Sequence, residues 1–211
     1  MISRSRLSPR FLKTSLALLC SALVTHCSAP RPTLNSDLIL QKFGSYGVQV
    51  LSQSGSVRVS NLFSGQASDS VTRTFAVVKF DEQLPQALQA PHQKILAGGS
   101  LGATLSDHGW KLAKRTLQHS ATMATPRLAR MMNIAVGTPL ATHVYALSVK
   151  ADNVNVHYAL IAEIHHPAHL TDVESKQRFP TETENDRRNG NHSHPSLEEL
   201  HKHVKSELRK P

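Results

Sequence analysis

The stretch that decides the fold is Ile134-Ala-Val-Gly-Thr-Pro-Leu140 and the chain that follows it to Glu163-Ile-His-His-Pro167. Apolar and polar residues alternate from Pro139 to Val149, a short polar turn follows at Ala151-Asp-Asn-Val154, and a second extended run covers Tyr158 to Ile164. Alternation on both sides of a tight turn is typical of a β-hairpin with one buried face. The proline that closes the stretch cannot donate to a sheet, so the second strand should end before it.

The segment just before this hairpin predicts a helix. It runs from Thr125 to Asn133, is entered through Pro126 and is left at Val136-Gly137. Gly137 should occupy a turn that needs a positive φ, which glycine adopts without steric cost.

The earlier chain predicts strands followed by helices inserted among strands. The expected elements are a helix over Asp37–Phe43 capped by Asn35 or Ser36, strands over Val48–Leu51, Val57–Phe63 and Val71–Phe80, a helix over Leu84–Leu96 interrupted at Pro91, a helix over Ser100–His108 after Gly98-Gly99, and a strand over Trp110–His119. This order indicates an α+β fold, an antiparallel β-sheet with helices packed on it.

The motifs in this region resemble those of a known family. The pattern N-I-x-x-G-T-P-L from Asn133, followed by a strand, an Asp turn and a strand, resembles the ligand-binding UTRA domain and its structural relative chorismate lyase. The segment Gly99-Ser-Leu-Gly-Ala-Thr-Leu105 is similar to the helix that opens that unit, so the resemblance covers roughly residues 98 to 170. It implies a UTRA-like domain over residues 34–174. No segment before residue 98 has the pattern of the winged-helix reader that normally accompanies such domains.

The resemblance also implies where a ligand would bind. Glu163 lies on the last strand, near where these families place polar groups that face their pocket, although a surface carboxylate is the alternative. Ser100 and Thr104 lie in the opening turn of a helix, where hydroxyls and free N–H groups suit an anion, and simple capping by Ser100 is the alternative.

One departure from the family concerns the strand after Gly-Thr-Pro, which usually carries an arginine that holds a phosphate or carboxylate. Here it reads Ala141-Thr-His-Val-Tyr-Ala-Leu147, in which His143 and Tyr145 would replace that contact only weakly. Arg115 and Arg73 are candidates for the missing charge, but they could equally be paired or solvated surface arginines. The departure weighs against lyase activity by the family's route.

Histidines near the end of the hairpin raise the question of a metal. Glu163 and His165 share a face of the strand while His166 points away, so tetrahedral ligation by three residues of this stretch is not evident, and we expect neither a metal nor a cofactor. His165 is instead a candidate ligand-binding residue beside Glu163. The tail histidines could chelate metal loosely or simply be solvated; they are His192, His194, His201 and His203.

The N-terminal residues 1–29 have the pattern of a signal peptide. A basic start precedes the apolar run Ser15–Val24, which is too short to cross a bilayer as a stable helix. Cys27 is a candidate for lipidation and membrane attachment, since Leu23-Val-Thr-His-Cys27 vaguely resembles a lipobox, though His26 departs from it. We therefore expect export to the periplasm or anchoring as a lipoprotein. The alternatives are an organelle transit peptide, an uncleaved anchor or a misassigned start.

Composition excludes several function classes. Both cysteines, Cys20 and Cys27, fall in the N-terminal segment, so the mature domain would offer no disulfide, cysteine nucleophile or cysteine zinc site. The formal charge is +9, but residues 37–174 hold 11 basic and 9 acidic residues, so the domain is nearly neutral and we expect no nucleic-acid partner. Residues 175–211 read as a polar, His-rich disordered tail with a short helix as the alternative over Leu197–Leu208.

Two function classes, with a third in reserve, follow from these observations. The first is an exported domain that binds a small polar or anionic molecule between its sheet and helices. The second is a chorismate lyase-like enzyme that eliminates pyruvate from an enolpyruvyl substrate by placement and electrostatic help, without a cofactor. The third is a structural envelope protein. Polar residues on the concave face of the sheet would favour binding, and an apolar face would favour the structural alternative.

Overall fold

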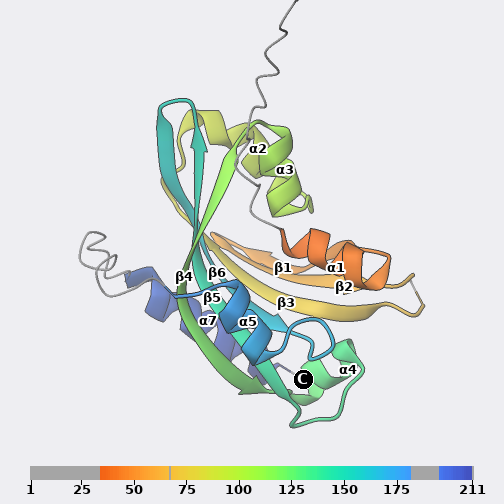
Figure 1. The fold of residues 1–211 in the computed structure, drawn as a ribbon. Coiled ribbons are helices and arrows are strands. Elements are labelled where there is room, and N and C mark those ends of the chain that lie inside the picture. The colour runs from red at the N-terminus through yellow and green to blue at the C-terminus, as the bar shows by residue number, and fades with distance from the viewer. Residues whose placement is uncertain (1–33, 67, 182–194, 211) are drawn as a thin grey trace, which may run out of the picture. The chain divides into compact units, whose positions relative to one another are not determined.

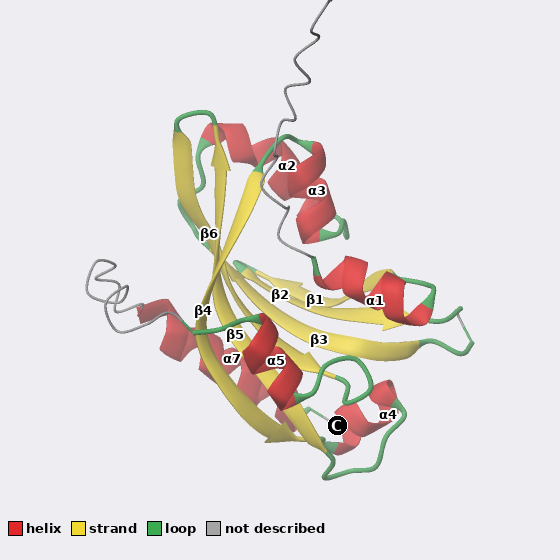
Figure 2. Cartoon of the chain, viewed as in Figure 1, coloured by secondary structure: helices red, strands yellow, loops and turns green. Residues whose placement is uncertain are grey.

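The computed structural model describes residues 34–66, 68–181 and 195–210. Figure 1 shows the course of the chain and Figure 2 its division into helices and strands. The elements are α1 (Asn35–Phe43), β1 (Gly47–Ser54), β2 (Val57–Ser64), β3 (Val71–Phe80), α2 (Gln86–Leu96), α3 (Leu101–Asp107), β4 (Lys111–Met123), α4 (Pro126–Met132), β5 (Pro139–Ala151), β6 (Val154–His165), α5 (Asp172–Arg178) and α7 (Pro195–Arg209).

The six strands form one antiparallel sheet in the order β1-β2-β3-β6-β5-β4. The pairing of β3 with β6 joins the N-terminal strands to the β5–β6 hairpin, with Ala76 opposite Glu163. The expected fold class, an α+β fold with helices packed on an antiparallel sheet, is confirmed.

The turns behave as their residues predict. The β5–β6 hairpin closes through two residues between Ala151 and Val154, and Asp152 adopts a φ of 48°, a conformation that Asp tolerates better than most residues. Helix α4 ends at Asn133 in the left-handed region, and Gly137 has a φ of 81° just before β5. The expectation of a positive φ at Gly137 is confirmed.

One face of the sheet carries a row of polar side chains. Residues directly opposite each other in antiparallel strands project to the same side. The register places Ser60 opposite Ala76, Ala76 opposite Glu163, Glu163 opposite His143, and His143 opposite His119. These residues therefore share one face, which we call the polar face.

The opposite face is mostly apolar, and α4 and α7 pack on it. Phe75, Val77 and Ile164 are buried there together with residues of α4, and Leu200 of α7 is fully buried in the same cluster. A second apolar cluster surrounds α2 and α3 and includes Trp110.

Several expected features of these elements differ from the structure. Helix α1 starts at Asn35 rather than Asp37, because Leu34 is the N-cap of the helix. The Leu34 N–H donates to Asp37 Oδ2 at 3.4 Å. Strand β4 continues beyond His119 to Met123 because its whole length pairs with β5. Pro91 does not interrupt α2 but lies buried within it.

The expected disordered tail is corrected in part. Helix α5 begins at Asp172, where the Thr171 side chain accepts from Glu174 N–H and the Glu174 carboxylate accepts from Thr171 N–H. Helix α7 is not a solvated tail but packs on the apolar face. Four of its side chains contact the apolar cluster of that face: Leu197, Leu200, Val204 and Leu208. The sequence favoured a solvated tail because α7 is polar on its other sides.

Several expectations fall outside the described residues. These are the signal peptide of residues 1–29, lipidation at Cys27, and the linker of residues 182–194. Within the described ranges, the helices are too short or too polar to cross a membrane.

Candidate functional site

A cavity of about 80 Å³ lies against the polar face of the sheet. The first residues of α1 and of α3 close it, and Figure 1 shows these two helices on the same side of the strands. Its polar lining consists of Asn35, Ser36, Tyr46, Arg58, Ser60, Ser100, Lys114, Tyr145 and Glu163, and the other lining residues are apolar apart from Gly102.

Glu163 is buried at the wall of this cavity, with only 5% of its surface exposed. Its Oε1 accepts hydrogen bonds from Asn35 Nδ2 at 3.2 Å and from the Tyr145 hydroxyl at 3.3 Å. Burial raises the pKa of Tyr145 well above 10, with the charge of Glu163 adding to the shift, so its hydroxyl stays protonated and can donate. The alternative of a surface carboxylate does not fit this position.

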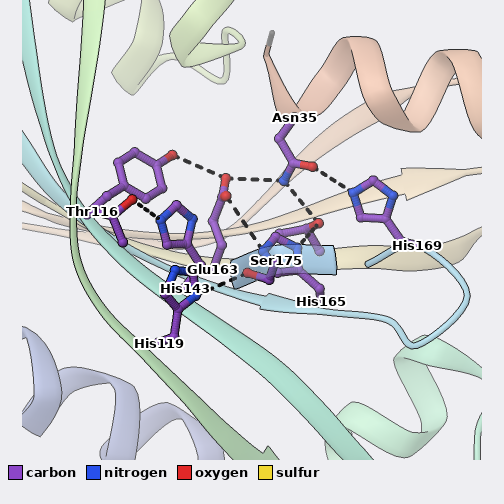
Figure 3. A network of polar contacts seen from close by, with 10 residues as sticks. Asn35, Thr116, His119, His143, Glu163, His165, His169 and Ser175 are labelled. Atoms are coloured by element: carbon purple, nitrogen blue, oxygen red, sulfur yellow. Dashed lines mark hydrogen bonds and ion pairs between the residues drawn. The ribbon is translucent and has the colours of Figure 1, made fainter. Parts of the chain in front are cut away.

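Two buried imidazoles lie next to Glu163, as Figure 3 shows. His165 Nδ1 lies 3.1 Å from the hydroxyl of Thr74, and His143 Nε2 lies 3.1 Å from the hydroxyl of Thr116. The other ring nitrogens, His165 Nε2 and His143 Nδ1, are buried and have no hydrogen-bond partner among the described residues. Each ring is thus anchored on one side and unsatisfied on the other.

Burial lowers the pKa of both His143 and His165 to about 3, so both rings are neutral at pH 7. Three potential donor atoms, one each from His143, Glu163 and His165, lie within 4.8 Å of one another. Neutral imidazole and carboxylate are the forms in which these side chains ligate metal ions.

The network extends from Glu163 to the first helix. Asn35 Nδ2 also donates to Thr74 Oγ1 at 3.0 Å, and Asn35 Oδ1 lies 2.7 Å from His169 Nε2, which must donate to it. Asn35 therefore links α1 to the sheet and to the turn after β6 (Figure 3).

Arg58 forms another part of the cavity wall. Its side chain is 2% exposed; Nε donates to Ser60 Oγ at 2.7 Å, and Nη1 donates to the carbonyls of Ile95 and Gly99 at 2.6 and 3.0 Å. Burial lowers its pKa, but a guanidinium starts so high that it remains charged. Among the described residues no carboxylate forms an ion pair with Arg58.

Lys114 adds a second positive charge to the cavity. Its half-buried ammonium lies 4.8 Å from the centre of the Tyr145 ring. In the described part of the chain this ammonium forms no salt bridge. The cavity thus has two cations on its wall and one carboxylate, Glu163, which is bonded to neutral donors.

The expected site residues separate into three groups. Ser100, Tyr145 and Glu163 line the cavity, and Ser100 Oγ lies 3.3 Å from the Tyr46 hydroxyl. His143 and His165 lie next to Glu163 but do not line the cavity. The structure does not bring Thr104 or Arg115 into this site.

Thr104 and the two expected arginines lie elsewhere. Thr104 packs beside Gly99, where a Cβ would meet its hydroxyl at 2.9 Å. Arg73 lies over the Phe43 ring at 3.9 Å and donates to Ser64 Oγ at 2.7 Å. Arg115 lies on the other face of the sheet, because it is opposite Ala146, a member of the apolar cluster.

Arg115 lines a larger groove of about 720 Å³. This groove contains two close pairs of polar groups: Lys79 Nζ lies 2.6 Å from Glu199 Oε2, and His157 Nδ1 lies 3.3 Å from Asp81 Oδ2. The cavity on the polar face is smaller, but its cations lack acidic partners among the described residues. It is the better candidate for a binding site.

Sequence reasoning missed Arg58, Lys114 and Asn35. A signal for Arg58 was present, since it stands between Val57 and Val59 in a strand and shares a face with Ser60. A charged residue within an apolar strand is seldom buried without a partner. No local pattern marks Asn35, whose bond to Glu163 spans 128 residues of sequence.

No family model and no curated protein matches the sequence. Solved structures show a general likeness. The ligand-binding domain of a protein described as a GntR-family transcriptional regulator from Bordetella bronchiseptica is 11% identical, with a TM-score of 0.39 over 59% of this chain and 87% of that chain. A GntR-family regulator from Enterococcus faecalis is 14% identical, with a TM-score of 0.38 over 60% of this chain and 93% of that chain. PhnF from Mycobacterium smegmatis is 15% identical, with a TM-score of 0.38 over 60% of this chain and 57% of that chain. With TM-scores below 0.5, these likenesses concern the course of the chain and say nothing of a ligand.

Proposed function

We propose that this protein binds a compact small molecule with an acidic group in the cavity on the polar face. The observation that carries the proposal is the pair of cations at the cavity wall, Arg58 and Lys114, neither of which has a carboxylate partner in the described part of the chain. Buried charges are normally paired, because leaving water without compensation costs free energy. An acidic ligand would supply the missing partner.

The polar face also favours binding over a purely structural role. A sheet that served only as a scaffold would gain most by burying apolar side chains beneath its helices. Here the covered face carries Arg58, Glu163 and His143, all less than 9% exposed. Burying such groups is costly, and a ligand site is a physical reason to bear that cost.

The cavity limits the size of the ligand. Its volume of about 80 Å³ suits a compact acid. Apolar side chains such as Leu147 and Ile161 form part of the lining. They suit a ligand with a short hydrocarbon or ring portion attached to its acidic group.

The proposal is tested by isothermal titration calorimetry of the full chain. The probes are pyruvate, 4-hydroxybenzoate, chorismate, inorganic phosphate and a sugar phosphate. We expect one of these acids to bind and Lys114→Gln to weaken it by about tenfold or more, since a hydrogen bond to a charged group contributes about 1.5–3 kcal/mol. Lys111→Gln is the matched control, because Lys111 is exposed on the same strand and does not line the cavity.

Two outcomes would contradict the proposal. One is that none of the five acids binds the wild-type protein. The other is that Lys114→Gln and Lys111→Gln bind the acid equally well. Analysis of the chorismate sample for 4-hydroxybenzoate and pyruvate tests the lyase alternative in the same experiment.

Export is a separate part of the proposal, and it rests on the sequence of residues 1–29. Expression of the full chain in a bacterial host should yield a mature form in the envelope fraction. Its measured mass should correspond to cleavage within residues 26–30, with an added lipid mass if Cys27 becomes the first residue. Recovery of the uncleaved chain in the cytosolic fraction would contradict export.

A further inference from the structure

His143, Glu163 and His165 form a cluster that the anion-binding proposal does not explain. The three side chains come from neighbouring strands, with His143 directly opposite Glu163 in the ladder and His165 two residues further along β6. All three side chains therefore lie on the polar face, although His143 is on β5 and the other two residues are on β6. We propose that they form a binding site for a divalent transition-metal ion, with Zn²⁺ as its simplest occupant.

The donor atoms are close enough to converge on one ion. Glu163 Oε2 lies 3.9 Å from His165 Nε2, and donors from all three residues lie within 4.8 Å of one another. Ligands of a tetrahedral zinc ion with bonds near 2.0–2.1 Å are about 3.3 Å apart. Small side-chain rotations toward a common centre would close this difference.

The unsatisfied nitrogens point to a missing ligand. His143 and His165 are both 0% exposed, yet His143 Nδ1 and His165 Nε2 have no hydrogen-bond partner among the described residues. Most buried polar atoms in folded proteins are hydrogen-bonded, because leaving one unsatisfied costs free energy. A metal ion would satisfy both at once.

The atoms behind the cluster are arranged as supports for metal ligands. A ligating histidine usually donates its other N–H to an oxygen, which fixes the ring. Thr74 Oγ1 and Thr116 Oγ1 occupy those positions, each 3.1 Å from the second nitrogen of its histidine. Glu163 is held in the same way, because Asn35 and Tyr145 bind Oε1 and leave Oε2 toward His165 (Figure 3).

The charge of the cluster also suits a cation. Imidazole binds metal in its neutral form and carboxylate in its ionised form. Two imidazoles and one carboxylate are a donor set used for divalent first-row metals, and three protein ligands leave one position open. Because Glu163 lines the cavity, that position would be reached from it. The metal site does not depend on whether an acid binds there.

The first experiment measures Zn²⁺ and Co²⁺ binding to the full chain by calorimetry, with metal content measured after dialysis. We expect about one ion per chain, and the visible absorption of Co²⁺ in a low-symmetry nitrogen and oxygen site. Variants H143Q and H165Q should each weaken binding at least tenfold. H92Q is the matched control, because His92 is a part-buried histidine bonded to the Tyr158 hydroxyl in another part of the fold.

The tail histidines could bind metal and must be separated from the site. A variant with His192, His194, His201 and His203 all changed to Asn removes them, and the proposal predicts that it keeps the site with unchanged affinity. Should H143Q or H165Q fail to fold, H143C provides a second test. A thiolate in place of the ring should retain Co²⁺ and add a sulfur-to-cobalt charge-transfer band.

Three results would overturn the proposal. The wild-type chain could bind neither ion, the tail variant could lose all binding, or folded H143Q and H165Q could bind as tightly as H92Q. Failure of acid binding in the Lys114→Gln experiment leaves these measurements unaffected. The two proposals can therefore fail independently.

Discussion

The two carboxylate oxygens of Glu163 have different surroundings, and this difference is the most informative feature at the scale of single residues. Oε1 accepts from Asn35 and Tyr145, whereas Oε2 faces His165 at 3.9 Å. One oxygen therefore positions the side chain and the other is available. The sequence predicted a pocket-facing Glu163 with a surface carboxylate as the alternative, and it had no means of distinguishing the two oxygens.

Removing this carboxylate should reduce stability. In Glu163→Ala the buried donors of Asn35 and Tyr145 lose their common acceptor, and we expect a loss of about 1–3 kcal/mol in the free energy of unfolding. Glu163→Gln retains an acceptor oxygen and should lose less. Urea denaturation with added chelator measures both, and equal stability of Glu163→Ala and the wild type would show that the hydrogen bonds contribute nothing.

Gly137 is a residue whose role the sequence predicted correctly. Its φ of 81° is strained for most side chains, and a Cβ there would meet nothing within 4 Å, so backbone strain is the main cost of a substitution. Gly137→Val should destabilise the fold by about 1–3 kcal/mol. Gly137→Asn is the control, because Asn tolerates the left-handed region. A melting temperature of Gly137→Val equal to that of the wild type would contradict this role.

At the scale of elements, local pattern determined most of the strands. The β-branched and aromatic residues of Val71–Phe80 led directly to β3, and the turn at Ala151-Asp-Asn-Val154 led to the β5–β6 hairpin. The pairing of β3 with β6 was not visible, since the register between strands far apart in sequence is set by packing rather than by local residues. That register brings Arg58 into the site, and this is why the arginine was missed.

Helix α7 shows a second limit of local pattern. Its apolar residues have helical spacing, but whether such a stripe is covered depends on a partner surface that the sequence does not reveal. In the structure that surface is the apolar face, and Lys79 Nζ adds an ion pair with Glu199 at 2.6 Å.

The docking of α7 predicts a large effect at Leu200. This side chain is 0% exposed in the apolar cluster, so Leu200→Ala should cost about 2–5 kcal/mol through lost burial and a cavity. Glu198→Ala on the exposed side of the same helix should stay within about 0.5 kcal/mol of the wild type. Chemical denaturation compares them. A neutral Leu200→Ala would mean that α7 is a solvated tail after all.

At the scale of the whole molecule, the buried histidines couple stability to pH. His143, His165 and His169 have pKa values of about 3, lowered mainly by burial, whereas an unfolded histidine titrates near 6.5. Between pH 6.5 and 3 the unfolded chain binds protons that the folded chain does not. Stability should therefore be constant above about pH 6.5 and fall as the pH decreases, by up to about 1.4 kcal/mol per pH unit for each histidine.

Urea denaturation midpoints at pH 7.5, 6 and 5 measure this dependence, with a chelator present so that no metal contributes. The variant H169Q should show a shallower fall than the wild type, because it removes one of the three groups. Equal midpoints at pH 7.5 and 5 would show that these histidines are not buried as neutral rings.

The central claim is that the cavity on the polar face binds an acid through Arg58 and Lys114. The most direct measurement is a crystal structure of the protein grown with the acid that binds most tightly in the calorimetric series. We expect the acidic group within hydrogen-bonding distance of the Arg58 guanidinium and the Lys114 ammonium, beneath the first turns of α1 and α3. An acid found in the Arg115 groove on the opposite face, with the cavity filled only by water, would contradict the claim.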